Sequence, residues 1–390
     1  MTMIKVLQFS PHNENCGIGK YQEQFVKEIE KAPKSLQVET EFYDSSQYKT
    51  RVMSDDELAV EMAKLTKTLI DGNYQILHIQ HEFGLYSKDE FAQMVAAGKA
   101  SGAKVVVTVH LSPALAFTRT PRDGVSLRSA VHVVRQRRLQ GIFEKRHIEA
   151  FRDCDLLITH NNGATASLIA YGVSRDKIFQ MLHPVLDPAD KSVRSTKLSE
   201  NLHRKEGDVI MSMVGYMHKF KGHEDAIRAL SYLPDNYKLA ILGGMQPVSD
   251  ELNIYNHLTN IILELGLKDR VYITGYVADD DYLNALIRES DVCVYPYNNA
   301  YYSQVSSGAL NLAFANDKPV LAYAVDSFVE ASKEFGQIVF TSAAAYYELA
   351  REIKRIDIDA QKSKVREFST KYSWKMSAKN IAEKYHELVD

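Results

Sequence analysis

The sequence predicts an α/β protein made of two doubly wound domains, each with a parallel sheet covered by helices on both faces. Short apolar runs alternate with longer amphipathic segments almost throughout the 390 residues. This alternating series occurs twice, and a polar stretch separates the two copies. Alternation of strands and helices is typical of parallel sheets, and a chain of this length can bury two cores. We therefore expect two domains rather than one barrel.

Each series supplies its own strands and helices. In the first, we expect strands at 4–9, 76–80, 105–110 and 156–160, with 178–182 as a further candidate, and helices at 19–30, 55–71, 88–101 and about 127–152. In the second, we expect strands at 209–214, 238–242, 271–274, 292–295, 319–322 and 338–340, with helices between them.

The polar stretch suggests where the domains divide. It contains proline, serine and many charged residues but shows no apolar periodicity, which is typical of a hinge. We expect a first domain over 1–187, a hinge region over 188–208, a second domain over 209–371 and a final amphipathic helix over 372–390.

Composition excludes several classes of protein. Hydrophobic residues make up 45% and charged residues 25%, with a net charge of −3, so nothing indicates nucleic-acid binding. No apolar run reaches the roughly 18 residues that span a bilayer, and residues 1–10 look like a first strand rather than a signal peptide. The three cysteines (Cys16, Cys154 and Cys293) have no metal-ligand spacing, as in a reducing cytoplasm.

The most informative segment is 214–224. An apolar run ends at Gly215, Lys219 and Lys221 follow within six residues, and a helical pattern begins after Gly222. This order places backbone amides, a helix N-terminus and ammonium groups at the carboxyl edge of a sheet. Such a site suits a diphosphate.

Two further segments could bind the same kind of anion. Gly17 and Gly19 flank Ile18 where the first strand leads into a helix, although many such turns use glycine only to bend. The run Ser306-Ser307-Gly308 reads as a helix start that could hold an anion or act as a plain serine N-cap. Segment 214–224 already places a helix N-terminus at a sheet edge in the same domain. The presence of two such helix starts favours anion binding over a plain N-cap.

Several histidines and arginines are candidates in the first domain. His110 ends a strongly apolar strand, so we expect it at the rim where ligands bind, with a core position as the alternative. His81 and Glu82 lie just past another strand and are ambiguous rim residues, whereas His78 inside that strand is interpreted as structural. Residues 119–152 carry nine Lys/Arg against three acids, which could bind an anionic acceptor or an acidic membrane face, or could simply be a solvated helix face.

Together these motifs resemble the retaining glycosyltransferases of family 4 with the GT-B architecture, over nearly the whole chain. The resemblance lies in seven segments: 15–21, 81–84, 107–110, 215–222, 243–244, 275–277 and 372–374. It implies two Rossmann-like domains facing each other across a cleft, with the final helix crossing back to the first domain.

The resemblance and the residue patterns above together imply a role for each candidate residue, with Arg135 and Arg138 taken from the basic excess over 119–152. The catalytic residues would be His110, which contacts the donor sugar, Lys221 and Gln304. The donor diphosphate would be bound by Gly17, Ile18, Gly19, Lys219, Lys221, Ser306, Ser307 and Gly308. The nucleotide would be bound by Gly215, Gly243, Tyr276, Val277 and Tyr297. The acceptor side would include His81, Glu82, Arg135 and Arg138.

The chain departs from that family at two places. Tyr216 stands where the family often has arginine, and Lys219 or His218 could supply the missing charge. Gln304 and Leu312 occupy the positions of two glutamates eight residues apart. Glutamine can still hydrogen-bond a sugar hydroxyl, whereas leucine cannot bind a ribose through a carboxylate. The chain therefore looks like an atypical member that lacks the paired glutamates.

The resulting prediction is a retaining hexosyltransferase that acts in polysaccharide biosynthesis. It would move a hexose from a UDP- or GDP-linked sugar to a hydroxyl of a glycan or lipid-linked acceptor, with no other cofactor. No Asp-x-Asp motif lies at a convincing rim position, so we expect it to act without a metal. We expect a cytoplasmic protein, with peripheral contact to the inner membrane face as an extension. The alternatives are a catalytically degenerate partner subunit and a nucleotide-sugar epimerase.

Overall fold

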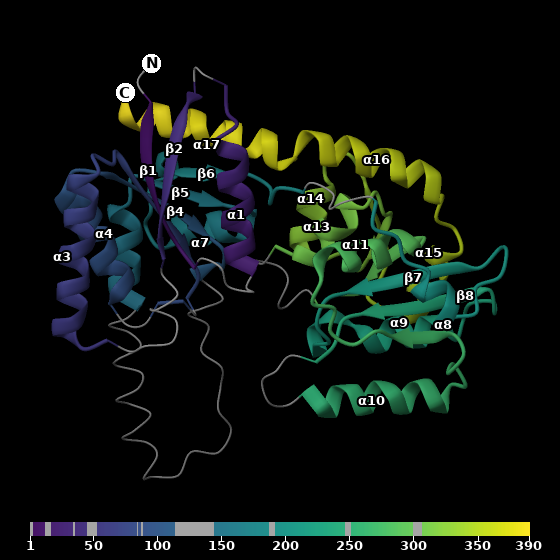
Figure 1. The fold of residues 1–390 in the computed structure, drawn as a ribbon. Helices are drawn as coiled ribbons and strands as arrows, with labels where there is room; N and C mark the ends of the chain where they lie inside the picture. The colour runs from purple at the N-terminus through teal and green to yellow at the C-terminus, as the bar shows by residue number, and fades with distance from the viewer. Residues whose placement is uncertain are drawn as a thin grey trace, which may run out of the picture. The chain divides into compact units, whose positions relative to one another are not determined.

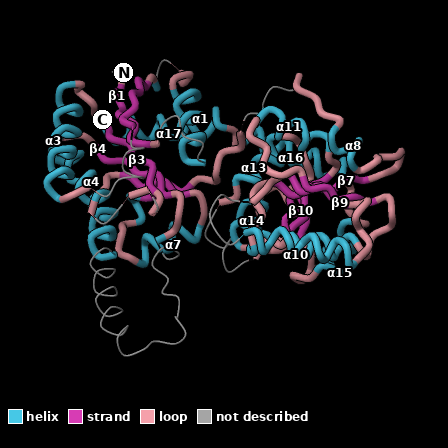
Figure 2. The backbone as a smooth tube through the Cα atoms, turned by 60° about the horizontal axis from the view of Figure 1, so that its bottom comes forward, coloured by secondary structure: helices cyan, strands magenta, loops and turns pink. Residues whose placement is uncertain are grey.

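The computed structural model describes residues 3–11, 17–33, 36–44, 53–83, 85–86, 89–113, 144–186, 192–245, 251–298 and 306–390 (Figure 1). The chain divides into two compact units. The first unit combines Met1–Leu182 with the C-terminal segment Trp374–Asp390, and the second unit is the continuous segment His183–Ser373. In each unit, helices enclose the strands (Figure 2).

The first unit contains a parallel sheet with the strand order β2-β1-β3-β4-β5-β6. Its strands are β1 (Ile4–Ser10), β2 (Val38–Asp44), β3 (Ile76–His81), β4 (Lys104–Val109), β5 (Leu156–Thr159) and β6 (Ile178–Gln180). Its helices include α1 (Gly17–Ile29), α3 (Asp55–Asp71), α4 (Glu90–Ser101), α7 (Asn162–Ala170), a helix over 144–153 and α17 (Trp374–Val389), with a 3-10 turn at Arg175–Lys177. Helix α17 packs on α1, so the end of the chain belongs to the first unit.

The two faces of this sheet differ in polarity because side chains alternate along a strand. Leu77 and Ile79 of β3 enter an apolar core with residues of α3 and α4. The alternate positions of the same strand, His78 and Gln80, are equally buried but polar. The face opposite the apolar core therefore carries buried hydrogen-bonding groups.

The second unit contains a parallel sheet with the strand order β12-β11-β10-β7-β8-β9. Its strands are β7 (Val209–Val214), β8 (Tyr237–Leu242), β9 (Val271–Ile273), β10 (Val292–Tyr295), β11 (Val320–Ala322) and β12 (Ile338–Phe340). Its helices are α8 (Lys197–Asn201), α9 (His223–Leu230), α10 (Glu251–Glu264), α11 (Asp280–Glu289), α13 (Gly308–Ala315), α14 (Asp326–Ser332), α15 (Tyr346–Ile353) and α16 (Ile358–Lys371). Helices α9, α10 and α15 share one apolar core with the sheet.

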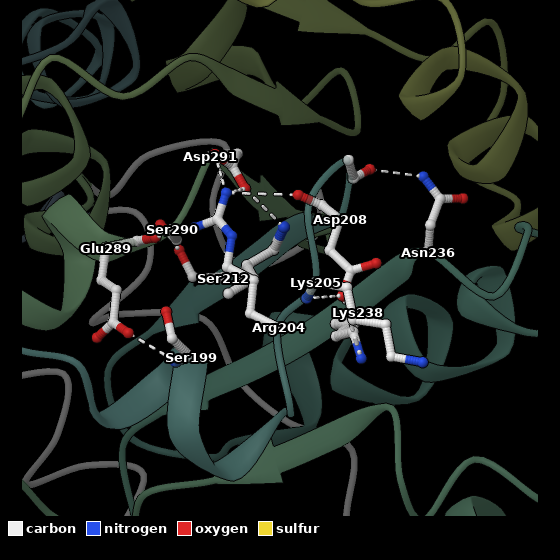
Figure 3. A network of polar contacts seen from close by, with 12 residues as sticks. Ser199, Arg204, Lys205, Asp208, Ser212, Asn236, Lys238, Glu289, Ser290 and Asp291 are labelled. Carbon is white, nitrogen blue, oxygen red and sulfur yellow. Dashed lines mark hydrogen bonds and ion pairs between the residues drawn. The ribbon is translucent and has the colours of Figure 1, made fainter.

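A charged network closes the amino edge of this second sheet (Figure 3). Arg204 pairs with Asp291 at 3.0 Å, and Asp291 also accepts a hydrogen bond from the amide of Ile210 at the start of β7. Lys238 of β8 lies 3.4 Å from Asp208 and donates to the Leu202 carbonyl at 2.6 Å. These contacts fix the segment that precedes β7 against the starts of β7 and β8 and against the residue that precedes β10.

The predicted fold class is confirmed, since both units are doubly wound α/β structures. The structure adds β2, an edge strand that the sequence analysis did not identify. Within the polar stretch expected as a hinge, residues 192–208 lie in the second unit, where α8 is anchored by buried Leu198 and by Glu289, which accepts hydrogen bonds from two of its amides. None of the helices that the structure describes combines the length and apolar character needed to span a bilayer.

Candidate functional site

The loop that follows β7 brings a lysine against a glycine. Gly215 has a φ of +99°, which favours glycine, and its amide donates to Leu242 at 2.9 Å. A Cβ atom on Gly215 would lie 2.7 Å from Lys221 Nζ, so the ammonium group lies directly beside this backbone. A cation and the end of a buried strand therefore meet at the carboxyl edge of the sheet, where open α/β sheets bind ligands.

Gly222 fixes the course of this loop. Its φ is +68°, and a Cβ atom there would lie only 2.0 Å from the carbonyl oxygen of Pro296, so no other residue fits without a backbone shift. The amide of Asn298 donates to the Phe220 carbonyl at 2.9 Å, which ties the segment after β10 to the same loop. Lys219 is exposed, and its Nζ lies 5.0 Å from the centre of the Phe220 ring. The two lysines thus project from a backbone that is held from both sides.

Close backbone packing continues toward β8 and β9. A Cβ atom on Gly243 would lie 2.2 Å from the Gly215 carbonyl oxygen, and one on Gly244 would lie 2.6 Å from the Tyr276 amide nitrogen. The rings of Tyr216 and Tyr276 stack with centroids 5.6 Å apart and an interplanar angle of 1°. Tyr276 is 58% exposed, so this pair presents an aromatic surface beside the glycine loop. Val277 follows it and is half-buried.

Ser307 caps α13, whose N-terminus lies at the same edge because the helix follows β10. The Ser307 hydroxyl accepts a hydrogen bond from the Leu310 amide at 3.3 Å and is buried, so the N-cap reading describes its side chain. This bond uses a lone pair of the Ser307 oxygen and leaves its O–H able to donate, so both the backbone amides and this hydroxyl can bind an anion at the helix start. Ser306 is half-buried and precedes the cap. Gln304 lies outside the described residues, and Leu312 is half-buried within α13.

A pocket of about 750 Å³ lies beside the glycine loop, between the start of α9, α10 and the segments that follow β10, β11 and β12. Of the predicted site residues, Lys219 and Tyr297 line it. His223 also lines it, and burial together with the nearby charge of Lys221 lowers the pKa of His223 to about 3. The imidazole of His223 is therefore neutral at pH 7. In the same pocket the Tyr323 hydroxyl donates to Asp225 at 2.7 Å, and burial raises the pKa of that carboxyl group.

In the first unit, His110 directly follows β4 and is half-buried. Its Nε2 lies 2.8 Å from Gln80 Oε1, and its ring meets Tyr21 edge-on with centroids 4.8 Å apart. The glycines predicted for the first loop lie in the helix instead, since α1 begins at Gly17. Gly17, Ile18 and Gly19 therefore form the first turn of α1, where backbone amides point along the helix axis toward the N-terminus.

The structure corrects the expected position of His81. Its side chain is 0% exposed and lies among aromatic rings, with centroid distances of 4.8 Å to Phe83, 4.3 Å to Phe91 and 5.0 Å to Phe151. Burial and the neighbouring His147 hold the pKa of His81 well below its usual value, so a neutral imidazole is tolerated in this core. His81 is therefore a core residue rather than an exposed rim residue. Glu82 is half-buried, whereas Arg135 and Arg138 lie outside the described residues.

The buried polar groups near His110 were not predicted from the sequence. Gln80 and Thr108 were not considered, and His78 was interpreted only as structural. The available signal was His78 and Gln80 at alternate positions of an otherwise apolar strand, which places both on one face of the sheet, together with Thr108 as a single polar residue in the apolar run 105–109. Within the part of the chain that the structure describes, no three His, Cys, Asp or Glu side chains gather closely enough to hold a metal ion.

Most of the second unit is similar to one known protein family. Residues 195–371 match the family model described as glycosyl transferases group 1. The chain is 30% identical over 152 residues to mannosylfructose-phosphate synthase of Agrobacterium fabrum, an alignment that covers 37% of this chain and 33% of that relative. The chain thus aligns with about a third of the length of that protein.

Solved structures match over the whole chain. They include Anabaena Alr3699/HepE in complex with UDP, at 15% identity and a TM-score of 0.69, covering 98% of this chain and 100% of that one. A glycosyltransferase from Rickettsia africae matches at 15% identity and a TM-score of 0.69, covering 100% of both chains. Sucrose-phosphate synthase from Thermosynechococcus elongatus matches at 15% identity and a TM-score of 0.66, covering 99% of both. The protein therefore has the two-unit GT-B fold. Residues 195–371 of its second unit are similar to the group 1 glycosyltransferases.

Proposed function

We propose that this protein is a retaining glycosyltransferase of family 4 that moves a hexose from a nucleotide diphosphate sugar to a hydroxyl group. The observation that carries the proposal is the position of Lys221 Nζ beside Gly215, in a loop that lies within the matched group 1 domain. Gly215 and Gly222 have positive φ, and because they lack side chains, Lys221 and the Pro296 carbonyl lie close to the loop backbone.

The proposed chemistry is mainly stabilisation of charge. As the bond between the sugar and the diphosphate breaks, negative charge grows on the leaving diphosphate. Lys221, Lys219 and the amides that begin α13 at Gly308 would stabilise that charge. Gly17, Ile18 and Gly19 of the first unit keep their proposed role as further amide donors. No protein nucleophile is needed, because a diphosphate oxygen can accept the proton of the attacking hydroxyl.

The donor that we propose is a UDP-linked hexose. One of the matched structures is that of Anabaena Alr3699/HepE with UDP, which supports a uridine nucleotide for this fold. The stacked pair of Tyr216 and Tyr276 would face the base. Gly215, Gly243, Val277 and Tyr297 complete the proposed nucleotide site. Nucleobases stack on aromatic side chains with about 1–3 kcal/mol per base.

His110 would contact the donor sugar, and Gln304 would bind its hydroxyls. Leu312 replaces a residue expected to bind the ribose, so we propose that the ribose is bound without a carboxylate from α13. We further propose that the reaction needs no metal, since lysines and amides supply the positive charge. We also propose that the protein is cytoplasmic and acts in polysaccharide biosynthesis. Its acceptor would be a glycan or a lipid-linked glycan.

A panel of nucleotide sugars tests the proposal. A donor present at 100 times its Kd should add about 2.7 kcal/mol to the free energy of unfolding, which a thermal shift assay detects. The stabilising donor is then incubated with acceptor hydroxyls, and NMR of the product should show the anomeric configuration of the donor retained. Conversion of the nucleotide sugar into its epimer without an acceptor would instead indicate an epimerase.

The replacement of an expected arginine by Tyr216 and of a glutamate by Leu312 specifically favours one other candidate, a catalytically degenerate subunit. In that case no nucleotide sugar would be turned over with any acceptor, and the protein would bind tightly to an active transferase. The same panel separates the two functions, because donor binding with turnover excludes the degenerate subunit.

A further inference from the structure

One short turn carries both lysines of the loop between β7 and α9. Lys219, Phe220 and Lys221 form a 3-10 turn, and the half-buried His218 directly precedes it. The Lys221 amide closes the turn by donating to the His218 carbonyl at 2.9 Å. The first amides of a helical turn have no acceptor within it, and the Phe220 amide donates to His218 Nδ1 at 3.3 Å. The side chain of His218 is therefore the N-cap of the turn.

Phe220 is held at both of its backbone groups. Its amide donates to His218, and its carbonyl accepts from the amide of Asn298 after β10 at 2.9 Å. The centroid of its ring lies 4.9 Å from that of His218 and 5.0 Å from Lys219 Nζ. Because the two lysines flank Phe220 in the chain, the bond that fixes its amide also affects where both ammonium groups lie.

The chemistry of the cap determines the charge of His218. A backbone N–H can only donate, so Nδ1 must present a lone pair to the Phe220 amide, and the ring is uncharged in this conformation. In a protonated imidazole both nitrogens are donors. Protonation of His218 would therefore place two N–H groups against each other and break the cap.

Charged groups of both signs surround His218. Glu224 lies 2.9 Å from His257 Nε2 and accepts from Arg228 at 2.8 Å, and the Tyr323 hydroxyl donates to Asp225. Both carboxylates are thus engaged by other groups, while the lysines of the turn oppose a further positive charge nearby. Apart from two tyrosines, the titratable groups that line the same pocket as His218 are Lys219, His223, Glu224, Asp225 and His257.

We propose that His218 is an uncharged positioning residue of the diphosphate site, which holds the turn that carries Lys219 and Lys221. It is then not the cation that replaces the arginine expected at Tyr216. The two roles predict opposite responses to acid, because a charge gained by His218 would attract an anionic donor, whereas loss of the cap releases the lysines. The ligand in this proposal rests on the proposed transferase function, but the cap itself does not.

Hydrogen exchange of the Phe220 amide in the full-length protein measures the cap directly. His218→Ala should lower the protection of this amide by about fivefold, which corresponds to one lost N-cap bond of about 1 kcal/mol. His218→Asn should keep the protection, because asparagine is among the best N-cap residues. His257→Ala is the matched control, since it removes another imidazole from the same pocket without touching the turn, and it should exchange like wild type.

The affinity for UDP, measured by calorimetry from pH 8 to pH 5.5, tests the role at the site. At pH 8, His218→Ala should bind UDP about fivefold more weakly than wild type and His218→Asn should bind it equally well. The asparagine side chain does not titrate, so the ratio of wild type to His218→Asn cancels protonation of UDP itself. As the pH falls, this ratio should not rise, and it should decrease by about fivefold once His218 is protonated.

Two results would overturn the proposal. One is unchanged protection of the Phe220 amide in folded His218→Ala. The other is stronger binding of UDP by wild type than by His218→Asn at low pH, which would make His218 a cation of the site. If UDP does not bind the wild-type protein at any pH, the proposed donor fails, while the exchange data still decide whether His218 holds the turn.

Discussion

The two edges of the second sheet use lysine in different ways. At the amino edge, Lys238 is buried, pairs with Asp208 and donates to a backbone carbonyl, so its charge is neutralised within the protein. At the carboxyl edge, Lys219 is exposed and Lys221 lies beside a glycine with positive φ. The surroundings, and not the residue type, distinguish a structural cation from one that can serve a ligand.

The backbone is also fixed by different contacts at the two edges of the second sheet. The amino edge is fixed by side chains, with Asp291 and Glu289 accepting hydrogen bonds from amides of β7 and α8. The carboxyl edge is fixed by direct backbone packing of Gly215, Gly222 and Gly243. Glycine packing holds the loop without adding side chains of its own, which suits the proposed site for a large anion.

Replacing Lys221 and Lys238 with methionine, one at a time, tests the difference between the two edges most directly. Lys221→Met should lower kcat/KM for sugar transfer by at least about a hundredfold, because one stabilising group for leaving-group charge is lost. Its free energy of unfolding should change little. Lys238→Met should show the reverse pattern, since it leaves Asp208 buried without its cation and should cost about 3 kcal/mol of stability.

Steady-state kinetics and urea unfolding of both variants check these expectations. Wild-type kcat/KM in Lys221→Met would remove this lysine from the proposed mechanism. A large kinetic defect in folded Lys238→Met would show that the amino edge also affects catalysis, and the distinction between the edges would fail.

Two glycines with nearly equal φ angles sharpen the comparison further. Gly222 at the carboxyl edge has a φ of +68°, and Gly266 between α10 and β9 has a φ of +67°. Alanine at either position should cost about 1 kcal/mol for the left-handed backbone. Gly222→Ala should cost about 2 kcal/mol more, because its Cβ would meet the Pro296 carbonyl whereas nothing lies within 4 Å at Gly266.

Urea midpoints of the two variants give the difference directly. Equal losses would mean that the loop moves away from Pro296 at little cost, and the carboxyl edge would then be less rigid than its packing indicates.

The two edges should also respond to acid in different pH ranges. The pKa of His223 is about 3 in the folded protein and 6.5 in the unfolded reference, so the unfolded chain binds more protons between these values. Stability therefore falls as the pH decreases from 6.5, by up to about 1.4 kcal/mol per pH unit for this one group. Despite burial, hydrogen bonds from the Lys205 amide and Lys238 keep the pKa of Asp208 below 3.8, so its contribution is lost only at more acidic pH.

Unfolding measured from pH 7 to pH 4 tests this difference. His223→Gln should flatten the pH dependence relative to wild type, while Asp208→Asn should lower stability at neutral pH without changing the slope between pH 5 and 6.5. An unchanged slope in His223→Gln would show that His223 is protonated in the folded state.

The smallest expected effect concerns the exposed ring at the carboxyl edge. Tyr276→Ala should raise KM for the nucleotide sugar by about tenfold with kcat nearly unchanged, because stacking on a base contributes about 1–3 kcal/mol. Tyr347→Ala on α15 is the matched control, since Tyr347 is 55% exposed against 58% for Tyr276. Equal KM values for the two variants would remove Tyr276 from the nucleotide site.

The fold was predictable where strands are continuous apolar runs, as in β7 and β10, whose bounds match those expected. Strand β2 was missed because VETEFYD alternates polar and apolar residues at the edge of a sheet and does not form an apolar run. The first turn of α1 was expected as a loop, since glycine pairs are more typical of turns than of helix starts.

Single residues were harder to place than elements. His81 was expected at a rim from its position at a strand end, but its side chain turns into an aromatic core that tolerates a neutral ring. Ser307 fitted an N-cap and an anion site equally well, and only its hydrogen bond to Leu310 shows that its hydroxyl is engaged in capping. Sequence position fixes the edge of a sheet at which a residue lies, whereas the direction of its side chain depends on packing partners far along the chain.

The docking of α17 on the first unit affects how this protein can be synthesised. Trp374 and Tyr385 are fully buried in a unit whose other residues all precede the second unit in the chain. The contact between Tyr385 and His78 on the polar face of the first sheet therefore cannot form until translation has passed through the entire second unit. We expect the second unit to complete its fold first on the nascent chain, although it is encoded later, because all of its segments are contiguous.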